Sequence, residues 1–303
     1  TIENVRDLDL LRFLMGAEKL NYLGVSYGTF VGAMYAELFP ERTGHLVLDS
    51  AVDITNEGEV FQAEGFETAL GLYADWCAGE GSCSLGNSRD EVISRINSFL
   101  HGLDANPIKV GDRQVSQGQG ATGIALFLYS GKEAYPRLTR TVEAAMNGNG
   151  RALLKAADGL TGRKENGWET SAYAFPAIRC VDHPDAGVAA TDDIRKKMAE
   201  KAPVFGSNMS SELVCERWTA NSAPNLKLTG KGAAPILVVG STGDSATPYQ
   251  QAVSMAKQLE SGHLLTYDGP GHGAVTAGNA CVDETITAYL QEGTLPEDGK
   301  TCS

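Results

Sequence analysis

Short apolar runs and stretches of helical periodicity alternate over the opening of the chain. A helix is predicted over residues 1–17, where apolar side chains recur at helical spacing among charged ones. Apolar runs at 20–24 and 45–49 enclose a mostly apolar helix at 29–38. Runs this short without polar alternation are typical of strands buried on both faces. The opening therefore predicts helix, strand, helix, strand, the order of a parallel sheet with crossover helices. The apolar positions of the first helix are Val5, Leu8, Leu11 and Met15.

The middle of the chain, from residue 54 to residue 226, has a different character. Apolar side chains recur there at helical spacing, and strand-like runs become scarce. We interpret residues 54–226 as one large, mainly helical insertion. One example of its spacing is the set Phe66, Leu70, Tyr73 and Ala74.

The sheet pattern returns after residue 226. Apolar runs at 235–240 and 263–267 predict two more buried strands. Between these two runs, Thr247 and Pro248 predict the start of a helix, with threonine as the N-cap and proline at the first helical position. A closing helix is expected at 282–290.

These patterns indicate an α/β fold with a mostly parallel sheet, flanking helices and a helical insertion. Residues 1–53 form the first part of the core, 54–226 the insertion and 227–303 the second part of the core. Open α/β sheets place their functional residues in the loops after the carboxyl ends of the strands. Candidate catalytic residues are therefore sought at those positions.

Composition limits the classes of partner. The net charge is −13, so the chain has little capacity to neutralise a phosphate backbone, and a nucleic-acid partner is not expected. No apolar run is long enough to span a bilayer, so a membrane partner is not expected either. No site for an organic cofactor is visible, and none is expected.

Six cysteines bear on the folding and the compartment of the protein. None forms a C-x-x-C pair, and no histidine stands at zinc-finger spacing from them, so we expect no metal site. Pairing between neighbours would close three local loops, although the sequence leaves the connectivity open. If the cysteines pair, the compartment is oxidising and the protein is secreted or otherwise extracellular. The neighbour pairs are Cys77–Cys83, Cys180–Cys215 and Cys281–Cys302.

The pentapeptide Gly24-Val25-Ser26-Tyr27-Gly28 joins the first predicted strand to the helix that follows it. Serine is a poor nucleophile at neutral pH, and it needs a base to take its proton and an acid to orient that base. A G-x-S-x-G sequence places such a serine on a tight strand-to-helix turn, where small neighbours are required. The pentapeptide is a weak signal by itself, because small residues cluster in many loops.

Candidates for the acid and the base follow the two later strands. Asp244 comes after the run that ends at Gly240, and His272 lies in the sequence Asp-Gly-Pro-Gly-His-Gly after the next run. The order Ser26, Asp244, His272 is that of a Ser-Asp-His triad on an α/β sheet. Asp49 is the rival acid, because it also follows a strand, and Asp244 has the alternative role of a helix cap.

These residues resemble the secreted actinobacterial tripeptidyl-aminopeptidase group of the α/β-hydrolases, which are relatives of the proline iminopeptidases. The resemblance implies an α/β-hydrolase fold with a helical cap over the triad. It also implies an exported serine exopeptidase that removes di- or tripeptides from a free N-terminus. The triad would be Ser26, Asp244 and His272, each of which matches the motif of the group. The matching stretches are 4–12, 23–29, 48–53, 177–182, 244–249 and 293–296.

One departure from that group concerns the oxyanion hole. Its members carry several strands and a His-Gly-Gly-Pro-type loop ahead of the segment where this chain starts, whereas no histidine precedes His45 here. That loop donates one oxyanion N–H, and the residue after the nucleophile, Tyr27, donates the other. We therefore expect a companion N-terminal chain of the same precursor, and Thr1 is consistent with a processed terminus. A truncated and inactive polypeptide is the alternative.

Recognition of a free amine calls for carboxylates in the cap. Asp182 and Glu212 are the candidates, because they lie near two cysteines that are expected to pair, and Glu169 and Glu216 are nearly as plausible. Five aromatic residues of the insertion are expected in the core of the cap rather than in a pocket. They are Trp76, Trp168, Trp218, Tyr173 and Phe175.

The sequence leaves three functions open. The leading hypothesis is a serine exopeptidase that forms an acyl-enzyme with a peptide bearing a free N-terminus. The second is an esterase or amidase that uses the same triad on small acyl substrates. The third is an inactive hydrolase-like binding protein, because one oxyanion donor has no visible source in this sequence.

Overall fold

The computed structural model describes residues 1–55, 61–81, 83–183, 188–209, 215 and 218–303. The chain divides into two compact units. The first, called the sheet unit, contains residues 1–65 and 223–303, and the second, called the helical unit, contains residues 66–222. No helix among the described residues combines the length and the apolar character needed to cross a membrane.

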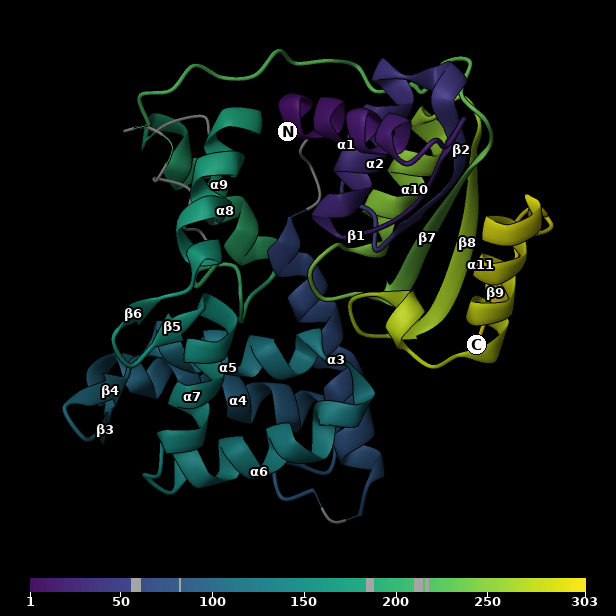
Figure 1. The fold of residues 1–303 in the computed structure, drawn as a ribbon. Helices are drawn as coiled ribbons and strands as arrows, with labels where there is room; N and C mark the ends of the chain where they lie inside the picture. The colour runs from purple at the N-terminus through teal and green to yellow at the C-terminus, as the bar shows by residue number, and fades with distance from the viewer. Residues whose placement is uncertain (56–60, 82, 184–187, 210–214, 216–217) are drawn as a thin grey trace. The chain divides into compact units, whose positions relative to one another are not determined.

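The sheet unit is built on a five-stranded sheet of order β1-β2-β7-β8-β9, in which every pair is parallel (Figure 1). The chain therefore crosses over between strands, as the alternating pattern predicts. The elements of this unit are α1 (Ile2–Leu14), β1 (Leu20–Val25), α2 (Tyr27–Leu38), β2 (Thr43–Asp49), β7 (Ile236–Gly243), α10 (Tyr249–Gln258), β8 (Gly262–Pro270), α11 (Ala280–Glu292) and β9 (Thr301–Cys302).

Strands β2 and β7, in the interior of the sheet, are buried on both faces. Leu46 and Leu48 of β2 pack into one hydrophobic cluster with α2 and α10, whereas Val47 between them packs into a second cluster with α11. Helices α1, α2 and α10 accordingly lie on one face of the sheet and α11 on the other (Figure 1). This arrangement explains why these strands read as continuous apolar runs rather than as alternating ones.

Helix α1 is attached to the sheet unit by apolar side chains and a polar network. Val5 is fully buried and Ile2 and Leu8 are partly buried against the core, whereas Leu11 and Met15 are 54% and 76% exposed. The polar network is centred on Asp9, which is buried and accepts hydrogen bonds from Arg12, Tyr35 and Arg42. Because these contacts fix the rotation of α1, much of its apolar surface faces outward.

The helical unit contains most of the helices expected between residues 54 and 226. The periodic set that begins with Phe66 is buried along α3, as its spacing predicts. Helix α5 begins with a capping box in which Ser116 and Gln119 satisfy each other's backbone N–H groups. The elements of the helical unit are α3 (Gln62–Gly79), whose first four residues fall in the sheet unit, α4 (Arg89–Ala105), β3 (Ile108–Val110), β4 (Arg113–Val115), α5 (Gln117–Tyr129), α6 (Tyr135–Met146), α7 (Arg151–Thr161), β5 (Arg163–Lys164), β6 (Gly167–Trp168), α8 (Thr170–Asp182) and α9 (Val188–Lys201).

All six cysteines form disulfides, and the pairs are those between neighbours along the chain. Two of them, Cys77–Cys83 and Cys180–Cys215, close loops within the helical unit. The third, Cys281–Cys302, joins the start of α11 to β9 and so holds the last strand on the edge of the sheet. Closing such loops removes conformations from the unfolded chain and so stabilises the fold.

Candidate active site

Ser26 lies on the turn between β1 and α2 with a backbone φ of 59° and ψ of −123°. This conformation is rare for a residue with a side chain, and such strain is typical of functional turns. Gly24 has to be glycine, because a Cβ there would lie 2.4 Å from the carbonyl oxygen of Gly28. The turn is closed by Thr29, whose backbone N–H donates to the Ser26 carbonyl oxygen at 2.9 Å. These are the features of a strained strand-to-helix elbow.

Asp244 lies at the carboxyl end of β7, and its side chain is completely buried. Its Oδ1 accepts the backbone N–H groups of Ala246 and Thr247, each at 2.9 Å. Its Oδ2 accepts the hydroxyl of Thr247 at 3.0 Å. Helix α10 begins only at Tyr249, with Pro248 as its N-cap, so the predicted capping role of Thr247 is wrong. The threonine fixes the carboxylate instead.

His272 follows β8 in a loop of small residues, and its side chain is 2% exposed. Its ring nitrogen Nδ1 lies 2.8 Å from Oδ1 and 3.1 Å from Oδ2 of Asp244. Thr247 Oγ1 lies 3.3 Å from the same nitrogen. An acid that accepts the Nδ1–H of an imidazole fixes the tautomer in which Nε2 can take a proton. The predicted acid and base are therefore in direct contact.

Backbone hydrogen bonds place the loops of the three predicted residues side by side. Gly271 donates its N–H to the carbonyl oxygen of Gly243, which joins the histidine loop to the acid loop. A Cβ on Gly273 would lie 3.7 Å from Cγ1 of Val25, the residue before Ser26. The two loops and the elbow thus meet at the carboxyl edge of the sheet, where α/β proteins bind their ligands.

Asp49, the rival acid, ends β2 and is also fully buried. Its oxygens accept the backbone N–H groups of Ala274 and Val275 at 3.2 and 3.0 Å. Burial raises the pKa of the Asp49 carboxyl, and the nearby charge of Asp244 also raises it. The two backbone hydrogen bonds lower the pKa but do not outweigh these effects. The side chain that bonds to the His272 ring is Asp244, whereas Asp49 bonds to the backbone after it.

Tyr27, the predicted oxyanion donor, is the first residue of α2 and directly follows Ser26. Backbone N–H groups at a helix N-terminus point out of the helix, where they favour negative charge. This position suits the N–H of Tyr27 for an oxyanion that forms at a substrate bound to Ser26.

The candidates for amine recognition belong to the helical unit. Asp182 is the last residue of α8 and is half-buried, and Glu212 lies outside the described residues, as does Glu216. Glu169 is an exposed residue whose carboxylate lies 3.4 Å from the ammonium of Lys164. These placements leave the choice of amine-binding residue as a prediction.

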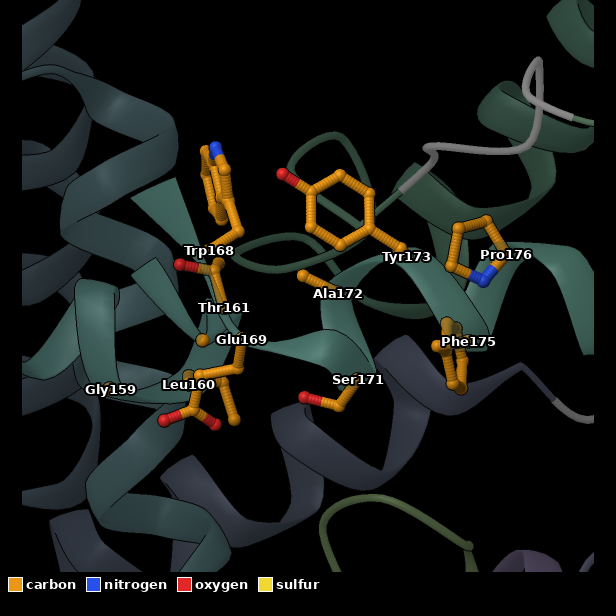
Figure 2. Close-up of a pocket in the computed structure, with 11 residues that line it drawn as sticks. Gly159, Leu160, Thr161, Trp168, Glu169, Ser171, Ala172, Tyr173, Phe175 and Pro176 are labelled. Carbon is orange, nitrogen blue, oxygen red and sulfur yellow. The ribbon is translucent and has the colours of Figure 1, made fainter. Parts of the chain in front are cut away.

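A pocket of about 610 Å³ lies in the helical unit at the β5–β6 hairpin and the start of α8. Trp168, Tyr173 and Phe175 line it and are 44%, 64% and 66% exposed. Figure 2 shows the rings of Trp168 and Tyr173 on the same side of this pocket, while the carboxylate of Glu169 points away from them. The expected core role of these three aromatics is therefore wrong, because they line an open pocket. Arg163 packs against Trp168, with its guanidinium carbon 5.3 Å from the ring centre.

Three residues make contacts around the predicted acid and base that were not predicted from the sequence. They are Thr247, which contacts both the acid and the base, and the pair Asp49 and Ser50, which bonds to the histidine loop. The stretch Leu48-Asp49-Ser50 was visible as a match to the peptidase group. Its function depends on contacts between distant segments, which sequence spacing does not reveal.

Two family models match the chain. Residues 2–89 match the model described as alpha/beta hydrolase fold, and residues 202–302 match the model described as TAP-like protein. The elbow lies within the first match and the acid and histidine loops within the second. A structure search gives MGS-M2, an alpha/beta hydrolase enzyme from a deep-sea metagenome library, at 14% identity and a TM-score of 0.38, over 97% of this chain and 72% of that one. At this score the likeness says nothing about function.

Curated relatives align over the whole of this chain. Serine protease Hip1 of Mycobacterium tuberculosis is 35% identical over 61% of its own length, and Carboxylesterase B of the same species is 34% identical over 60%. Tripeptidyl aminopeptidase of Streptomyces lividans is 29% identical over 58%. The chain thus spans about 60% of the length of these relatives. Together with the parallel sheet, the two family models show that the chain has the α/β-hydrolase fold.

Proposed function

We propose that this chain carries the catalytic triad of a serine exopeptidase, with Ser26 as nucleophile, His272 as base and Asp244 as orienting acid. The observation that carries the proposal is the buried contact between Nδ1 of His272 and Asp244 at 2.8 Å, beside the strained elbow of Ser26. A histidine–aspartate pair that only stabilised the fold would not require a serine with positive φ on the neighbouring turn.

The proposed reaction follows from these positions. Oγ of Ser26 attacks the carbonyl carbon of the scissile amide while Nε2 of His272 takes the hydroxyl proton. The negative charge that develops on the carbonyl oxygen is stabilised by the N–H of Tyr27. The C–N bond then breaks, the leaving amine takes the proton from His272, and water hydrolyses the acyl-enzyme by the same route. Asp244 keeps its charge throughout and stabilises the imidazolium.

The relatives support a peptide substrate and also favour one alternative. Two of the three carry names of peptidases, Serine protease Hip1 and Tripeptidyl aminopeptidase, whereas the third is named Carboxylesterase B. A hydrolase of small esters with the same triad is therefore the second candidate. The two differ in whether the free ammonium of the substrate contributes to binding.

A matched pair of substrates separates these candidates. Hydrolysis of a tripeptide amide with a free amine is compared with that of its N-acetylated form, using the protein as its host produces it. An exopeptidase cleaves the free-amine substrate at least about 100-fold faster, because loss of a buried charge pair costs several kcal/mol. Equal rates on both substrates would exclude the exopeptidase and favour the esterase or amidase.

Covalent labelling tests whether the chain is catalytic at all. A fluorophosphonate reacts only with an activated serine, so the wild-type chain should be labelled and Ser26→Ala should not. Ser241→Ala is the matched control, because Ser241 is another buried serine of the sheet, and its hydroxyl has no hydrogen-bond partner among the described residues. An unlabelled wild-type chain would favour the inactive binding protein.

We further propose that the α1–β1 apolar face binds an N-terminal segment of the same precursor, which supplies the second oxyanion donor. Strand β1 is an edge strand that pairs only with β2 in the described sheet, so its other edge is available to a partner strand. The α1–β1 apolar face consists of exposed apolar side chains on the two sides of this edge. Leu10, Leu11, Phe13, Leu14 and Met15 belong to α1 or directly follow it, whereas Leu23 and Val25 of β1 point to the sheet face opposite α1, because Leu23 is in register with Val47.

The length that this chain lacks relative to its relatives, and the apolar character of the surface, support an N-terminal segment as the occupant. About 40% of the length of these relatives has no counterpart in this chain, and an apolar surface next to a strand edge is suited to a strand with a covering helix.

A denaturing gel of the native protein should show a second band beside the one at 32.1 kDa. Phe13→Asp and Leu23→Asp should lose that band, whereas Ile178→Asp, an exposed apolar residue of the helical unit, should keep it. A single band at 32.1 kDa in the wild type would overturn the proposal.

The three disulfides also support export as part of this proposal, because such bonds persist in oxidising compartments. Fractionation of the host with an antibody to the chain tests it. Recovery from the reducing cytoplasm alone would contradict export.

A further inference from the structure

The dipeptide Asp49-Ser50, at the end of β2, contacts the backbone of the histidine loop, the elbow and the acid-bearing strand. We propose that Asp49 and Ser50 are positioning residues, which hold the segment after His272 and thereby fix the imidazole against Asp244. The inference rests on the proposed triad, since a positioning role has meaning only if His272 is the base. Neither residue contacts the ring of His272 in the hydrogen bonds described here, so both act through the backbone.

Asp49 supplies the acidic part of this arrangement. Its two carboxylate oxygens accept one backbone N–H each, from Ala274 at 3.2 Å and from Val275 at 3.0 Å. The side chain belongs to a fully buried residue, which is an unfavourable place for a carboxyl unless it is hydrogen-bonded. An apolar residue at this position would leave two N–H groups of the loop without these acceptors. The carboxyl therefore fixes the second and third residues after His272.

Ser50 supplies the acceptor for the first residue after His272. Its Oγ accepts the backbone N–H of Gly273 at 2.7 Å, in a buried bond between residues 223 positions apart. Ser50 has a φ of 51°, the only positive φ other than that of Ser26 among the described residues that are not glycine. Glycine would adopt this conformation without strain, but it would lose the hydroxyl. The geometry thus favours a role for the hydroxyl itself.

The backbone of the same dipeptide extends the arrangement to the other two parts of the triad. The carbonyl oxygen of Asp49 accepts the N–H of Ser26 at 3.0 Å, and the N–H of Ser50 donates to the carbonyl oxygen of Val239 on β7 at 3.0 Å. Two consecutive residues therefore bond to the nucleophile, to the strand that leads to Asp244, and to three consecutive residues after His272. A shift of this dipeptide would displace all three predicted catalytic residues.

The charge of Asp49 should affect the pH profile of kcat/KM, which a purely structural role of this residue would leave unchanged. The ionisable group that acts on it is Asp244, which repels its charge and is itself bonded to His272. Replacing Asp49 by asparagine removes a negative charge from the surroundings of the imidazolium that forms during catalysis. The acidic limb of the pH profile of kcat/KM should therefore move to lower pH, because the neutral imidazole becomes easier to keep.

The experiment compares Asp49→Asn, Ser50→Gly and Ser50→Ala with the wild type on the free-amine tripeptide substrate and in fluorophosphonate labelling. We expect kcat and the labelling rate to fall by about 10- to 100-fold in each, because a misplaced imidazole transfers the proton poorly, while KM changes by less than about threefold. Ser50→Gly is the decisive variant, since it relieves the strained φ and folds at least as readily as Ser50→Ala. Ser241→Ala serves again as the buried-serine control and should behave as the wild type.

Three results would overturn the inference, and a fourth bears on the proposed function alone. Wild-type kcat in Ser50→Gly would show that the hydroxyl has no role. A fall in kcat that matches a loss of folded protein, measured by thermal unfolding, would reduce both residues to structural ones. An unchanged low-field NMR resonance of the His272 Nδ1–H in Asp49→Asn and Ser50→Gly would show that the ring has not moved. If Ser26→Ala keeps full activity, the triad itself is wrong, whatever these variants do.

Discussion

Two buried aspartates end neighbouring strands of the sheet, Asp49 on β2 and Asp244 at the end of β7, and they differ in what their oxygens accept. Asp244 accepts backbone N–H groups of its own loop and lies 2.8 Å from a ring nitrogen of His272. Asp49 accepts the backbone N–H groups of Ala274 and Val275, which belong to the loop that carries His272. Both side chains are inaccessible to solvent.

The comparison shows that burial of a carboxyl does not by itself identify a catalytic acid. Each aspartate follows a buried strand and each is held by hydrogen bonds, so the two are nearly equivalent by position and exposure. What separates them is the single contact with an imidazole, because only that contact can select a tautomer and stabilise an imidazolium. The hydrogen-bond partner, rather than burial, therefore distinguishes the predicted catalytic acid from the other aspartate.

The largest expected effect tests this assignment directly. Asp244→Asn should reduce kcat by roughly 10⁴-fold, since the amide favours the wrong tautomer of His272. Asp49→Asn should reduce it by at most about 100-fold. Steady-state kinetics on the free-amine tripeptide substrate measures both. Asp268→Asn is the matched control, because Asp268 is an exposed carboxylate near the end of β8, and it should leave kcat unchanged. Equal losses in Asp244→Asn and Asp49→Asn would remove the distinction.

A third buried aspartate, Asp9, sharpens the comparison because it lies away from the predicted triad and bonds to charged partners. Burial acts to raise the pKa of Asp9, but hydrogen bonds from Arg12, Tyr35 and Arg42 outweigh it and hold the pKa below 3.8. Asp9→Asn should lower the free energy of unfolding, because Arg12, whose side chain is 9% exposed, loses its counter-charge. Labelling of Ser26 in the folded protein should not change.

The pH dependence of this effect has a definite sign. A carboxyl with a lowered pKa contributes stability that is present above its unfolded pKa, near 3.8, and is lost as the pH falls through the lower folded value. The difference between the wild type and Asp9→Asn should therefore be greatest near pH 7 and shrink below pH 4. Urea unfolding at several pH values measures it. A difference that does not vary with pH would show that the charge of Asp9 contributes nothing.

The sequence allowed the parallel sheet and the three predicted catalytic residues to be found, because each residue follows a short apolar run. Such runs are local, and a loop of small residues after each of them is visible without tertiary information. The role of Asp49 was not accessible in this way, since β2 and β8 are separated by β7 in the sheet. The outward face of α1 was also missed, because helical spacing cannot show which side Asp9 will hold against the sheet unit.

The smallest expected effect concerns the stability of Asp49→Asn and separates its positioning role from a structural one. Burial raises the pKa of Asp49, with repulsion from Asp244 adding to it, so the folded state holds its proton at a pH where the unfolded chain, with a pKa near 3.8, has released it. The stability that this proton contributes is fully present below pH 3.8 and is lost as the pH rises through the higher folded value.

Asparagine does not titrate, so Asp49→Asn should gain in stability relative to the wild type as the pH rises from about 3.5 to 7. Urea unfolding of the two proteins across this range, with Asp268→Asn as the exposed control, measures the trend. The expected combination at pH 7 is a small change in stability with a clear loss of kcat. A variant that becomes less stable relative to the wild type as the pH rises would show that the charged carboxylate stabilises the fold, and that Asp49 resembles Asp9 more than a residue adapted for catalysis.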